Sequence, residues 1–289
     1  MRLQDVKDIE IELFLDAMRL RHGYDFSNYS RASLKRRILG LLPALGFDRI
    51  VDMLPSLLYE HGFHLHVISL LSVPVSEMFR NPEVFLSLRK KVAPVLQSYP
   101  QINIWVAGCA TGEEVYSLAI LLKEENLYDR TQIYATDIND AALAKAEEGV
   151  YPVKLLKDYA GAYLKAGGAF SLENYYQSLY DFGMMDSSLK KNIVFAHHNL
   201  VADGVFCEVN MILCRNVLIY FDRYLQGRVL HLLRDSFARG GFLCLGNKES
   251  LEFSDVAVDF KTIDFSCRIY QCVPNLPQTS WSPDDMTSL

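Results

Sequence analysis

In the C-terminal two thirds of this 289-residue chain, apolar runs typical of β-strands alternate with helical segments. INIWVA is followed by a glycine-containing turn and a helical segment at 113–125, and QIYATD by another at 139–148. The pattern continues with the apolar runs NIVFAHHNL and MILCRNVLIYF, a helical segment at 222–237 and the run GFLCLG. The alternation predicts an α/β fold with a doubly wound, mostly parallel sheet. Two late β-like runs, 257–263 and 265–273, are predicted to close it as an antiparallel hairpin.

Residues 1–75 lack this alternation and are predicted to form a small all-helical domain. An amphipathic helix that stops at Gly23 is indicated by apolar residues at steps of three and four, namely Val6, Ile9, Leu13, Ala17 and Leu20. Ser30 is predicted to cap a second helix that ends before Pro43. Two more helices are expected between residues 50 and 71.

The second domain is predicted to span residues 76–273. Asn81 and Pro82 are typical of a helix start, and this helix is expected to reach about residue 97. The alternation pauses at 151–192, which is rich in Tyr, Gly and Lys and is interpreted as an inserted subdomain. Residues 274–289 are rich in Pro, Ser and Asp and are predicted to be a disordered tail.

Half of the residues are apolar and 22% are charged, which is typical of a globular protein. No apolar stretch reaches about 18 residues, and the acidic N-terminus does not resemble a signal peptide. We therefore expect a cytoplasmic protein without membrane insertion. The six cysteines form no CxxC pair and are expected to be reduced, mostly buried thiols. The histidines lack the cysteine or carboxylate neighbours of a metal site, so no metal is expected.

The net charge of −6 is unevenly distributed. Six basic residues and one acidic residue lie between Arg19 and Gly40 and give a local charge of +5, while the other 267 residues carry −11. A nucleic-acid-binding protein would show a basic excess over a whole domain, so nucleic acid is not an expected partner. The patch indicates either a docking surface for an acidic partner or a solvated helix face.

The turn after the first strand lies where a doubly wound sheet binds its ligand, at the carboxyl end of the strand. This turn, residues 108–114, contains neither a GxGxxG nor a GxxxxGK[ST] motif. Glu113 and Glu114 begin the next helix, and a helix that receives a pyrophosphate would not place two carboxylates at that end. The sequence therefore favours a cationic or zwitterionic ligand over a nucleotide phosphate.

Asp137 ends the second strand, 29 residues after Gly108. A carboxylate in this place can accept hydrogen bonds from both hydroxyls of a ribose. Its alternative role is to cap the following helix. S-adenosylmethionine is a ribose-bearing ligand without phosphate that carries an ammonium and a sulfonium. The glycine turn, the paired glutamates and the strand-end aspartate together predict this cofactor.

The motifs GCATGEEVYS, ATDIN, CRNVLIYFD and SEMFRNP resemble the CheR family of chemotaxis-receptor glutamate methyltransferases. SRASLKRRI, the insertion and GNKESL also resemble that family, so the likeness covers nearly the whole chain. It implies a Rossmann-like methyltransferase fold that uses S-adenosylmethionine and releases S-adenosylhomocysteine. The implied partner is the cytoplasmic helical region of a methyl-accepting receptor. The insertion resembles a β-subdomain that in some members grips a receptor tail.

The resemblance implies roles for individual residues. Arg80 would contact the cofactor and orient the substrate carboxylate, and Tyr220 would face the methyl group; a structural ion pair and aromatic packing are their alternative roles. Glu113 or Glu114 would hold the methionine end, and Asp137 the ribose. Further cofactor contacts would come from Ser76, Gly108, Asn199, Leu200, Asn216 and Val217.

A receptor-binding surface is implied on the second helix, where an acidic receptor helix would face four basic residues, Arg31, Lys35, Arg36 and Arg37. Pro74, Asn247 and Lys248 depart from the family pattern. The alternative functions are a sensor or scaffold that binds S-adenosylmethionine, or a methyltransferase acting on a non-chemotaxis signalling partner. A nucleic-acid amino-methyltransferase would need an Asn/Asp-Pro-Pro-Tyr turn where this chain reads RNV.

Overall fold

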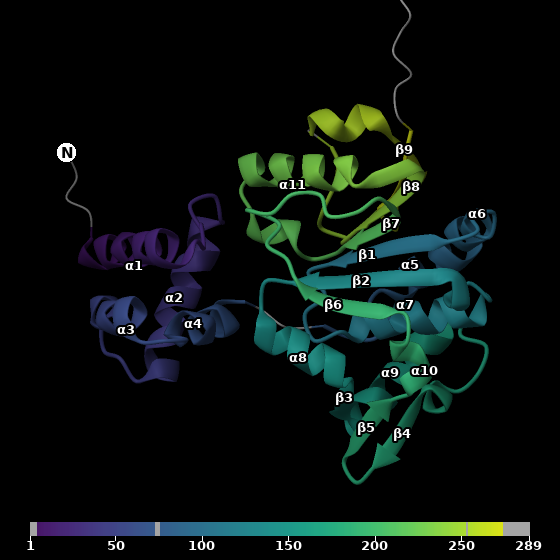
Figure 1. The fold of residues 1–289 in the computed structure, drawn as a ribbon, viewed down its shortest axis with the longest axis horizontal. Helices are drawn as coiled ribbons and strands as arrows, with labels where there is room; N and C mark the ends of the chain where they lie inside the picture. Colours follow the sequence, from purple (N-terminus) through teal and green to yellow (C-terminus); the bar gives the residue numbers. More distant parts are fainter. Residues whose placement is uncertain (1–4, 73–75, 253, 274–289) are drawn as a thin grey trace, which may run out of the picture.

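The structure is a computed structural model that describes residues 5–72, 76–252 and 254–273. Figure 1 shows a small helical domain beside a larger α/β domain, from which a second, smaller sheet projects. The predicted fold class is confirmed: a mostly parallel sheet with helices, an all-helical N-terminal part and an inserted β-subdomain. Pro74 and the predicted tail at 274–289 lie outside the described residues.

The N-terminal domain packs four α-helices and a 3₁₀ turn around one core of apolar side chains. The elements are α1 (Val6–His22), α2 (Arg31–Leu45), the 3₁₀ turn Ile50–Met53, α3 (Leu54–Tyr59) and α4 (Phe63–Leu71). Gly23 ends α1 in the left-handed conformation, with φ 78°, as the sequence predicts.

The predicted apolar face of α1 is the exposed one. Val6 and Leu20 are 68% and 74% exposed, and Ile9 and Leu13 are also exposed. The core instead receives a second apolar stripe of the same helix, formed by Ile11, Phe14 and Met18. Periodicity detects both stripes, but only packing against the other helices decides which one is buried.

The predicted end of α2 is wrong by three residues. The helix continues through Pro43 to Leu45 and ends at Gly46, which adopts the left-handed conformation with φ 75°. Pro43 lies in the last turn, so its missing N–H removes a single helical hydrogen bond there. The side chain of Ser30 occupies the N-cap position without making a capping hydrogen bond.

The central sheet has seven strands in the order β6-β2-β1-β7-β8-β10-β9. β10 pairs antiparallel with both β8 and β9, so the predicted C-terminal hairpin forms, and the other pairs of this sheet are parallel. The strands are β1 (Ile102–Ala107), β2 (Thr131–Asp137), β6 (Ile193–His197), β7 (Val209–Cys214), β8 (Phe237–Leu245), β9 (Phe260–Asp264) and β10 (Ile269–Cys272).

Helices cover both faces of this sheet (Figure 1). Alternate residues of β1 point to opposite faces: Ile104 packs in one core with Phe85 and Leu118, and Trp105 packs in the other with Leu225. The helices are α5 (Pro82–Ser87), which continues through a π-helical turn (Leu88–Val92) into α6 (Ala93–Leu96), then α7 (Glu113–Glu124), α8 (Asp140–Glu148) and α11 (Arg223–Asp235).

The insertion forms an antiparallel sheet in the order β3-β5-β4, with α9 beside it. Its elements are β3 (Val150–Pro152), α9 (Val153–Lys165), β4 (Tyr176–Leu179), β5 (Phe182–Met185) and α10 (Ser187–Lys190). A buried network fastens it to the main domain: Glu124 of α7 pairs with Arg89 and accepts hydrogen bonds from the hydroxyls of Tyr163 and Tyr175.

All six cysteines are free thiols, as expected. Five are buried, and Cys207, in the loop between β6 and β7, is partly exposed.

Candidate active site

A cavity of about 380 Å³ opens where the carboxyl ends of β1, β2, β6 and β7 meet the all-helical domain. Its size falls within the range of about 300–1,000 Å³ that is usual for small-molecule sites. It brings together ten of the eleven predicted cofactor and catalytic residues: Ser76, Arg80, Gly108, Glu114, Asp137, Asn199, Leu200, Asn216, Val217 and Tyr220.

The turn after β1 makes the floor of the cavity, and Gly108 is fixed there by geometry. Its φ is 73°, and its backbone N–H donates to the Thr136 carbonyl at 2.8 Å. A Cβ atom added at Gly108 would lie 2.4 Å from Cγ2 of Val217. Only glycine therefore allows the β1 turn and the β7 loop to approach this closely.

Asp137, at the end of β2, is oriented by two backbone amides. Its two carboxylate oxygens accept hydrogen bonds from the N–H groups of Ala110 and Asn139, both at 2.9 Å. Asn139, not Asp137, caps α8 through the N–H of Ala142. Burial raises the pKa of Asp137, and the amides oppose the rise. An ionised carboxylate has about four acceptor sites, so acceptor capacity remains for a ligand.

The two glutamates that open α7 have different surroundings. Glu113 is 7% exposed and lies outside the cavity lining, where it accepts a hydrogen bond from the Thr111 hydroxyl at 2.7 Å. Burial raises its pKa. Glu114 lines the cavity and forms an ion pair with Arg215, with 2.5 Å between Oε2 and Nη1. Of the two candidates for the methionine end, only Glu114 reaches the cavity.

Arg215 is a site residue that the sequence analysis missed. It is 5% exposed, and its Nη2 donates to the Arg80 carbonyl and to Oδ1 of Asn81, both at 3.0 Å. Asn81 occupies the N-cap position before Pro82, as the predicted helix start requires, but its side chain makes no capping hydrogen bond. Nε of Arg215 is buried without a hydrogen-bond partner among the described residues. The position of Arg215 directly before Asn216 in the CRNV motif was the available signal.

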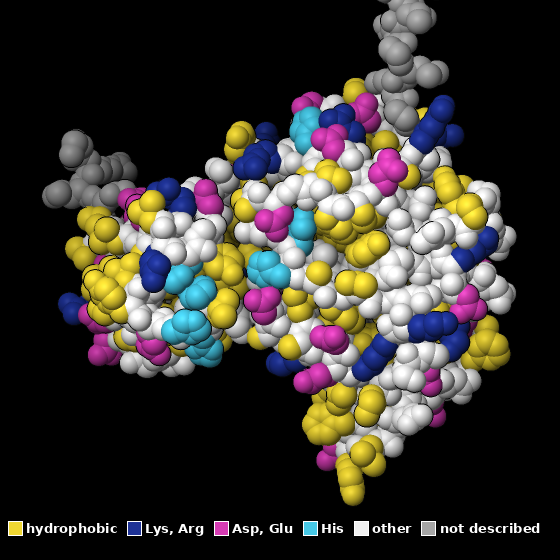
Figure 2. Space-filling model, viewed as in Figure 1, with side chains coloured by type: hydrophobic (Ala, Val, Ile, Leu, Met, Phe, Trp, Pro, Cys, Tyr) yellow, Lys and Arg dark blue, Asp and Glu magenta, His cyan; other side chains and the backbone are white. Residues whose placement is uncertain are grey.

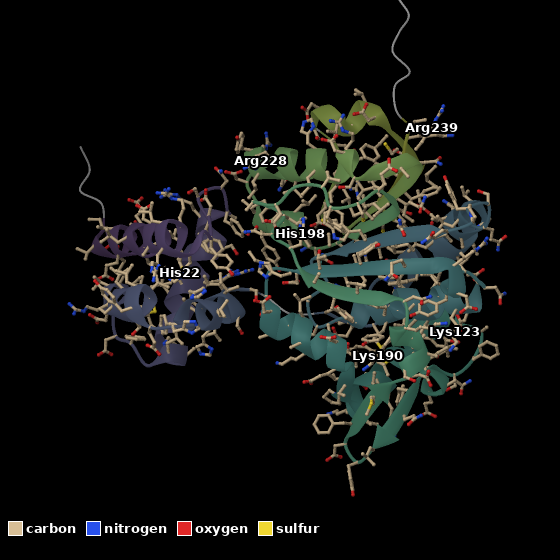
Figure 3. The ribbon with its side chains drawn as sticks, viewed as in Figure 1. His22, Lys123, Lys190, His198, Arg228 and Arg239 are labelled. Carbon is tan, nitrogen blue, oxygen red and sulfur yellow. The ribbon has the colours of Figure 1, made fainter. Side chains whose placement is uncertain are left out.

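The end of β6 supplies a wall of the cavity. The side-chain Oδ1 of Asn199 accepts a hydrogen bond from the Val201 N–H at 3.0 Å, which fixes the orientation of the Asn199 amide group. His198, labelled in Figure 3, lies on the side of the sheet that faces the all-helical domain, and its ring packs edge-on against Trp105 and Phe206. His198 lines the cavity but was not predicted to do so.

The loop after β7 is held by a second missed residue, Glu249. Its carboxylate accepts hydrogen bonds from the N–H groups of Asn216 at 2.9 Å and Gly246 at 2.7 Å, and from the Ile219 N–H at 3.3 Å. Burial raises the pKa of Glu249, and these amides oppose the rise. Asn216, with φ 62°, is thereby kept in a left-handed conformation beside the cavity.

Tyr220 shares the cavity with one arginine from each domain, Arg37 and Arg80. The Arg37 guanidinium lies 4.4 Å above the centre of the Tyr220 ring and donates to the Leu71 carbonyl at 2.8 Å. Arg80 lines the same cavity, and its side chain makes no hydrogen bond or ion pair to other described residues. The arrangement leaves Arg80 available to a ligand carboxylate.

The predicted receptor-binding residues do not share one surface. Arg31 and Lys35 point back to α1, where they pair with Glu12 and Asp8. Arg37 turns into the cavity, and Arg36 is exposed on the outside of α2. Helical geometry explains this division, because Arg36 and Arg37 lie 100° apart around the helix and Lys35 lies on the side opposite Arg37.

No described helix is long and apolar enough to cross a membrane. Within the described residues, no group of three or more His, Cys, Asp or Glu side chains could hold a metal ion.

Residues 74–267 match the family model for the CheR methyltransferase SAM-binding domain, and residues 9–71 match the CheR all-alpha domain. The chain belongs to the CheR methyltransferase family. As a CheR family member it is an S-adenosylmethionine-dependent methyltransferase, and the cofactor predicted from the sequence is confirmed.

Related proteins align with most of the length of this CheR chain. A Pseudomonas putida protein with the provisional name methyltransferase Cher3 is 46% identical over 91% of this chain and 97% of its own length. The chemotaxis protein methyltransferase of Listeria innocua is 30% identical over 79% of this chain and 85% of its own length. Among solved structures, the N-methyltransferase NodS from Bradyrhizobium japonicum, in complex with S-adenosyl-l-homocysteine, aligns with 59% of this chain and 62% of the NodS chain. The sequence identity is 15%, and the TM-score of 0.34 is too low to inform function.

Proposed function

We propose that this enzyme transfers the methyl group of S-adenosylmethionine to glutamate side chains of a methyl-accepting chemotaxis receptor in the cytoplasm. The products would be glutamyl methyl esters and S-adenosylhomocysteine. The observation that carries the proposal is the meeting of Arg37, Arg80 and Tyr220 in one cavity with Asp137. Similarity to the Listeria protein named as a chemotaxis protein methyltransferase supports a role in chemotaxis.

The residues of the cavity fit the cofactor. Asp137 has acceptor capacity for a ribose, and Glu114 places a carboxylate where an ammonium or sulfonium needs one. The Gly108 turn lets Val217 of the β7 loop pack closely against the backbone, so that both segments line the cavity. In our proposal, Asn199 and Leu200 flank the adenine, and Asn216 and Val217 contact the cofactor from the β7 loop. Ser76 and Gly108 complete the set.

Methyl transfer forms a carbon–oxygen bond as the carbon–sulfur bond breaks, and the bound cofactor supplies an electrophilic methyl group. The attacking glutamate has an ordinary pKa near about 4.3, so it is ionised at neutral pH and needs no general base. The task of the chain is to position that carboxylate and exclude water. Arg80 would grip its two oxygens with the planar guanidinium, and the Tyr220 hydroxyl would steer it.

The exposed basic residue Arg36 is proposed to contact the acidic receptor helix outside the cavity. Arg37, which lies in the cavity, would attract the glutamate being methylated. Arg31 and Lys35 already pair with α1 carboxylates, so their contribution to docking would require exchange of those partners.

The test uses the full chain, tritiated S-adenosylmethionine and membranes that contain a methyl-accepting receptor. We expect labelled receptor whose label is released as methanol by base. Arg80→Ala should lower the rate by at least about tenfold, a larger factor than its loss of affinity for S-adenosylhomocysteine. Arg36→Glu should raise the receptor KM and leave cofactor affinity unchanged. Binding of cofactor without base-labile label would contradict the proposal and favour a sensor or scaffold.

A further inference from the structure

Tyr29 reaches the cofactor cavity from the all-helical domain. It lies in the segment between α1 and α2 and lines the same cavity as Asp137 and Tyr220. Its hydroxyl makes no hydrogen bond to other described residues. A polar group placed at a cavity wall without a protein partner is available to a ligand.

The backbone around Tyr29 is tied to the β7 loop. Tyr29 and Phe221 form an antiparallel β-bridge between the two domains. On either side of it, the Ser30 N–H donates to the Tyr220 carbonyl at 3.0 Å, and the Asp222 N–H donates to the Asn28 carbonyl at 2.8 Å. The position of Tyr29 is therefore set by the loop that also carries Tyr220.

The ring of Tyr29 is held by two aromatic neighbours. Its centre lies 4.9 Å from that of Phe26 and 5.0 Å from that of Phe221, both in edge-on geometry. These contacts leave the hydroxyl as the part of the side chain that can act on a ligand.

The electrostatic surroundings keep this hydroxyl protonated. Burial raises the pKa of Tyr29, the Asp137 carboxylate raises it further, and the Arg37 guanidinium opposes the rise. A neutral phenol is both a donor and an acceptor of hydrogen bonds. A ribose hydroxyl that donates its hydrogen to Asp137 keeps its oxygen lone pairs, which can accept a hydrogen bond from this phenol.

We propose that Tyr29 is a cofactor-binding residue supplied by the all-helical domain, with its hydroxyl hydrogen-bonded to the adenosine part of S-adenosylmethionine beside Asp137. Because Tyr29 is bridged to Phe221, cofactor binding and docking of the two domains are linked. The inference rests on the proposed role of Asp137 and adds a contact from the other domain.

The first test is calorimetric titration of the full chain with S-adenosylhomocysteine, without receptor. Tyr29→Phe retains the ring and should bind about 3- to 10-fold more weakly, the loss typical of one neutral hydrogen bond. Tyr24→Phe is the matched control, because Tyr24 is in the same inter-helix segment but outside the cavity lining, and its affinity should stay unchanged.

Asp137→Asn separates two kinds of failure. If Asp137→Asn weakens binding and Tyr29→Phe does not, the Tyr29 assignment is overturned and the Asp137 role stands. If neither variant binds more weakly, the proposed cofactor geometry is wrong as well. A raised receptor KM in Tyr29→Phe with unchanged affinity for S-adenosylhomocysteine would also overturn the proposal and assign the hydroxyl to the substrate.

Hydrogen exchange tests the linkage between domains independently of affinity. Saturating S-adenosylhomocysteine should slow exchange of the bridging amides of Ser30 and Asp222 by at least about fivefold in the native chain. In Tyr29→Ala, measured at the same fractional saturation with S-adenosylhomocysteine, the slowing factor should be less than half of that in the native chain. Equal protection with and without ligand in the native chain would refute the linkage.

Discussion

The ion pairs Arg89–Glu124 and Arg215–Glu114 are both buried, but their surroundings differ. The side chains of Arg89 and Glu124 are 8% and 3% exposed, and Glu124 also accepts hydrogen bonds from two tyrosines. The side chains of Arg215 and Glu114 are 1% and 14% exposed. This second pair borders the cavity, and one nitrogen of its arginine lacks a partner among the described residues.

The difference separates architecture from ligand binding. Removing a charge from water is costly, and the cost is repaid only when the remaining donors and acceptors are satisfied. The network around Glu124 satisfies them within the protein and fastens the inserted subdomain. Glu114 instead lines the cavity, where we propose that its carboxylate also meets the cofactor.

Glu124→Ala should have the largest effect. It removes the acceptor shared by Arg89, Tyr163 and Tyr175, and we expect a loss of about 3–5 kcal/mol in the free energy of unfolding. Denaturant unfolding followed by circular dichroism measures it. Glu125→Ala, which removes the more exposed partner of Arg89, should cost about 1 kcal/mol. Equal losses would show that the network does not act as a unit.

Gly108→Ala should damage the cavity without touching either ion pair. The new methyl group meets Val217, and the positive φ strains the backbone, so we expect about 2–4 kcal/mol of lost stability or cofactor binding. Thermal unfolding with and without S-adenosylhomocysteine separates the two. Adding Val217→Ala should restore part of the loss; a double variant as poor as Gly108→Ala would place the cause in the backbone alone.

Glu114→Gln should separate binding from stability. The amide oxygen can still accept from Arg215, so we expect less than about 1.5 kcal/mol of lost stability. Without the negative charge, affinity for S-adenosylmethionine should fall about tenfold, measured by calorimetry. The reverse result, a large stability loss with normal affinity, would make this pair equivalent to Arg89–Glu124.

Asp264 offers an ion pair near the surface for the same comparison. The hydrogen bond from Lys91, then that from Ser87, holds its pKa well below the ordinary value. Its contribution to stability is therefore present above a pH of about 4 and is lost as the pH falls through its folded pKa. Asp264→Asn should cost at most about 1 kcal/mol at pH 7 and flatten the acid limb of stability against pH. An unchanged acid limb would contradict this assignment.

The α/β domain was predictable because its strands are buried between helices. The strand and helix segments from INIWVA to GFLCLG form with ends within a few residues of those expected, since alternating elements of this kind have few other arrangements. The carboxyl ends of the strands then bring Gly108, Asp137 and Asn216 to one cavity.

Features that depend on tertiary packing were not predictable. The exposed stripe of α1 that includes Val6 and Leu20 has the same spacing as a core face, and Phe14 and Met18 fill the core instead. Arg215 and Glu249 act through partners distant in the chain, Glu114 and Asn216. No local sequence pattern shows that these residues and their partners will meet in the folded chain. The roles of the individual site residues stay predictions that the variants above test.

Cys207 gives this chain a natural attachment point for a reporter. Cys207 is the one partly exposed thiol. It directly follows Phe206, which packs on Trp105 and on His198 of the cavity lining. A maleimide fluorophore should therefore label one site without mutagenesis, since the other five thiols are shielded. Ligand titrations could then be read optically from the loop between β6 and β7, which also carries Asn199 and Leu200 of the cavity lining.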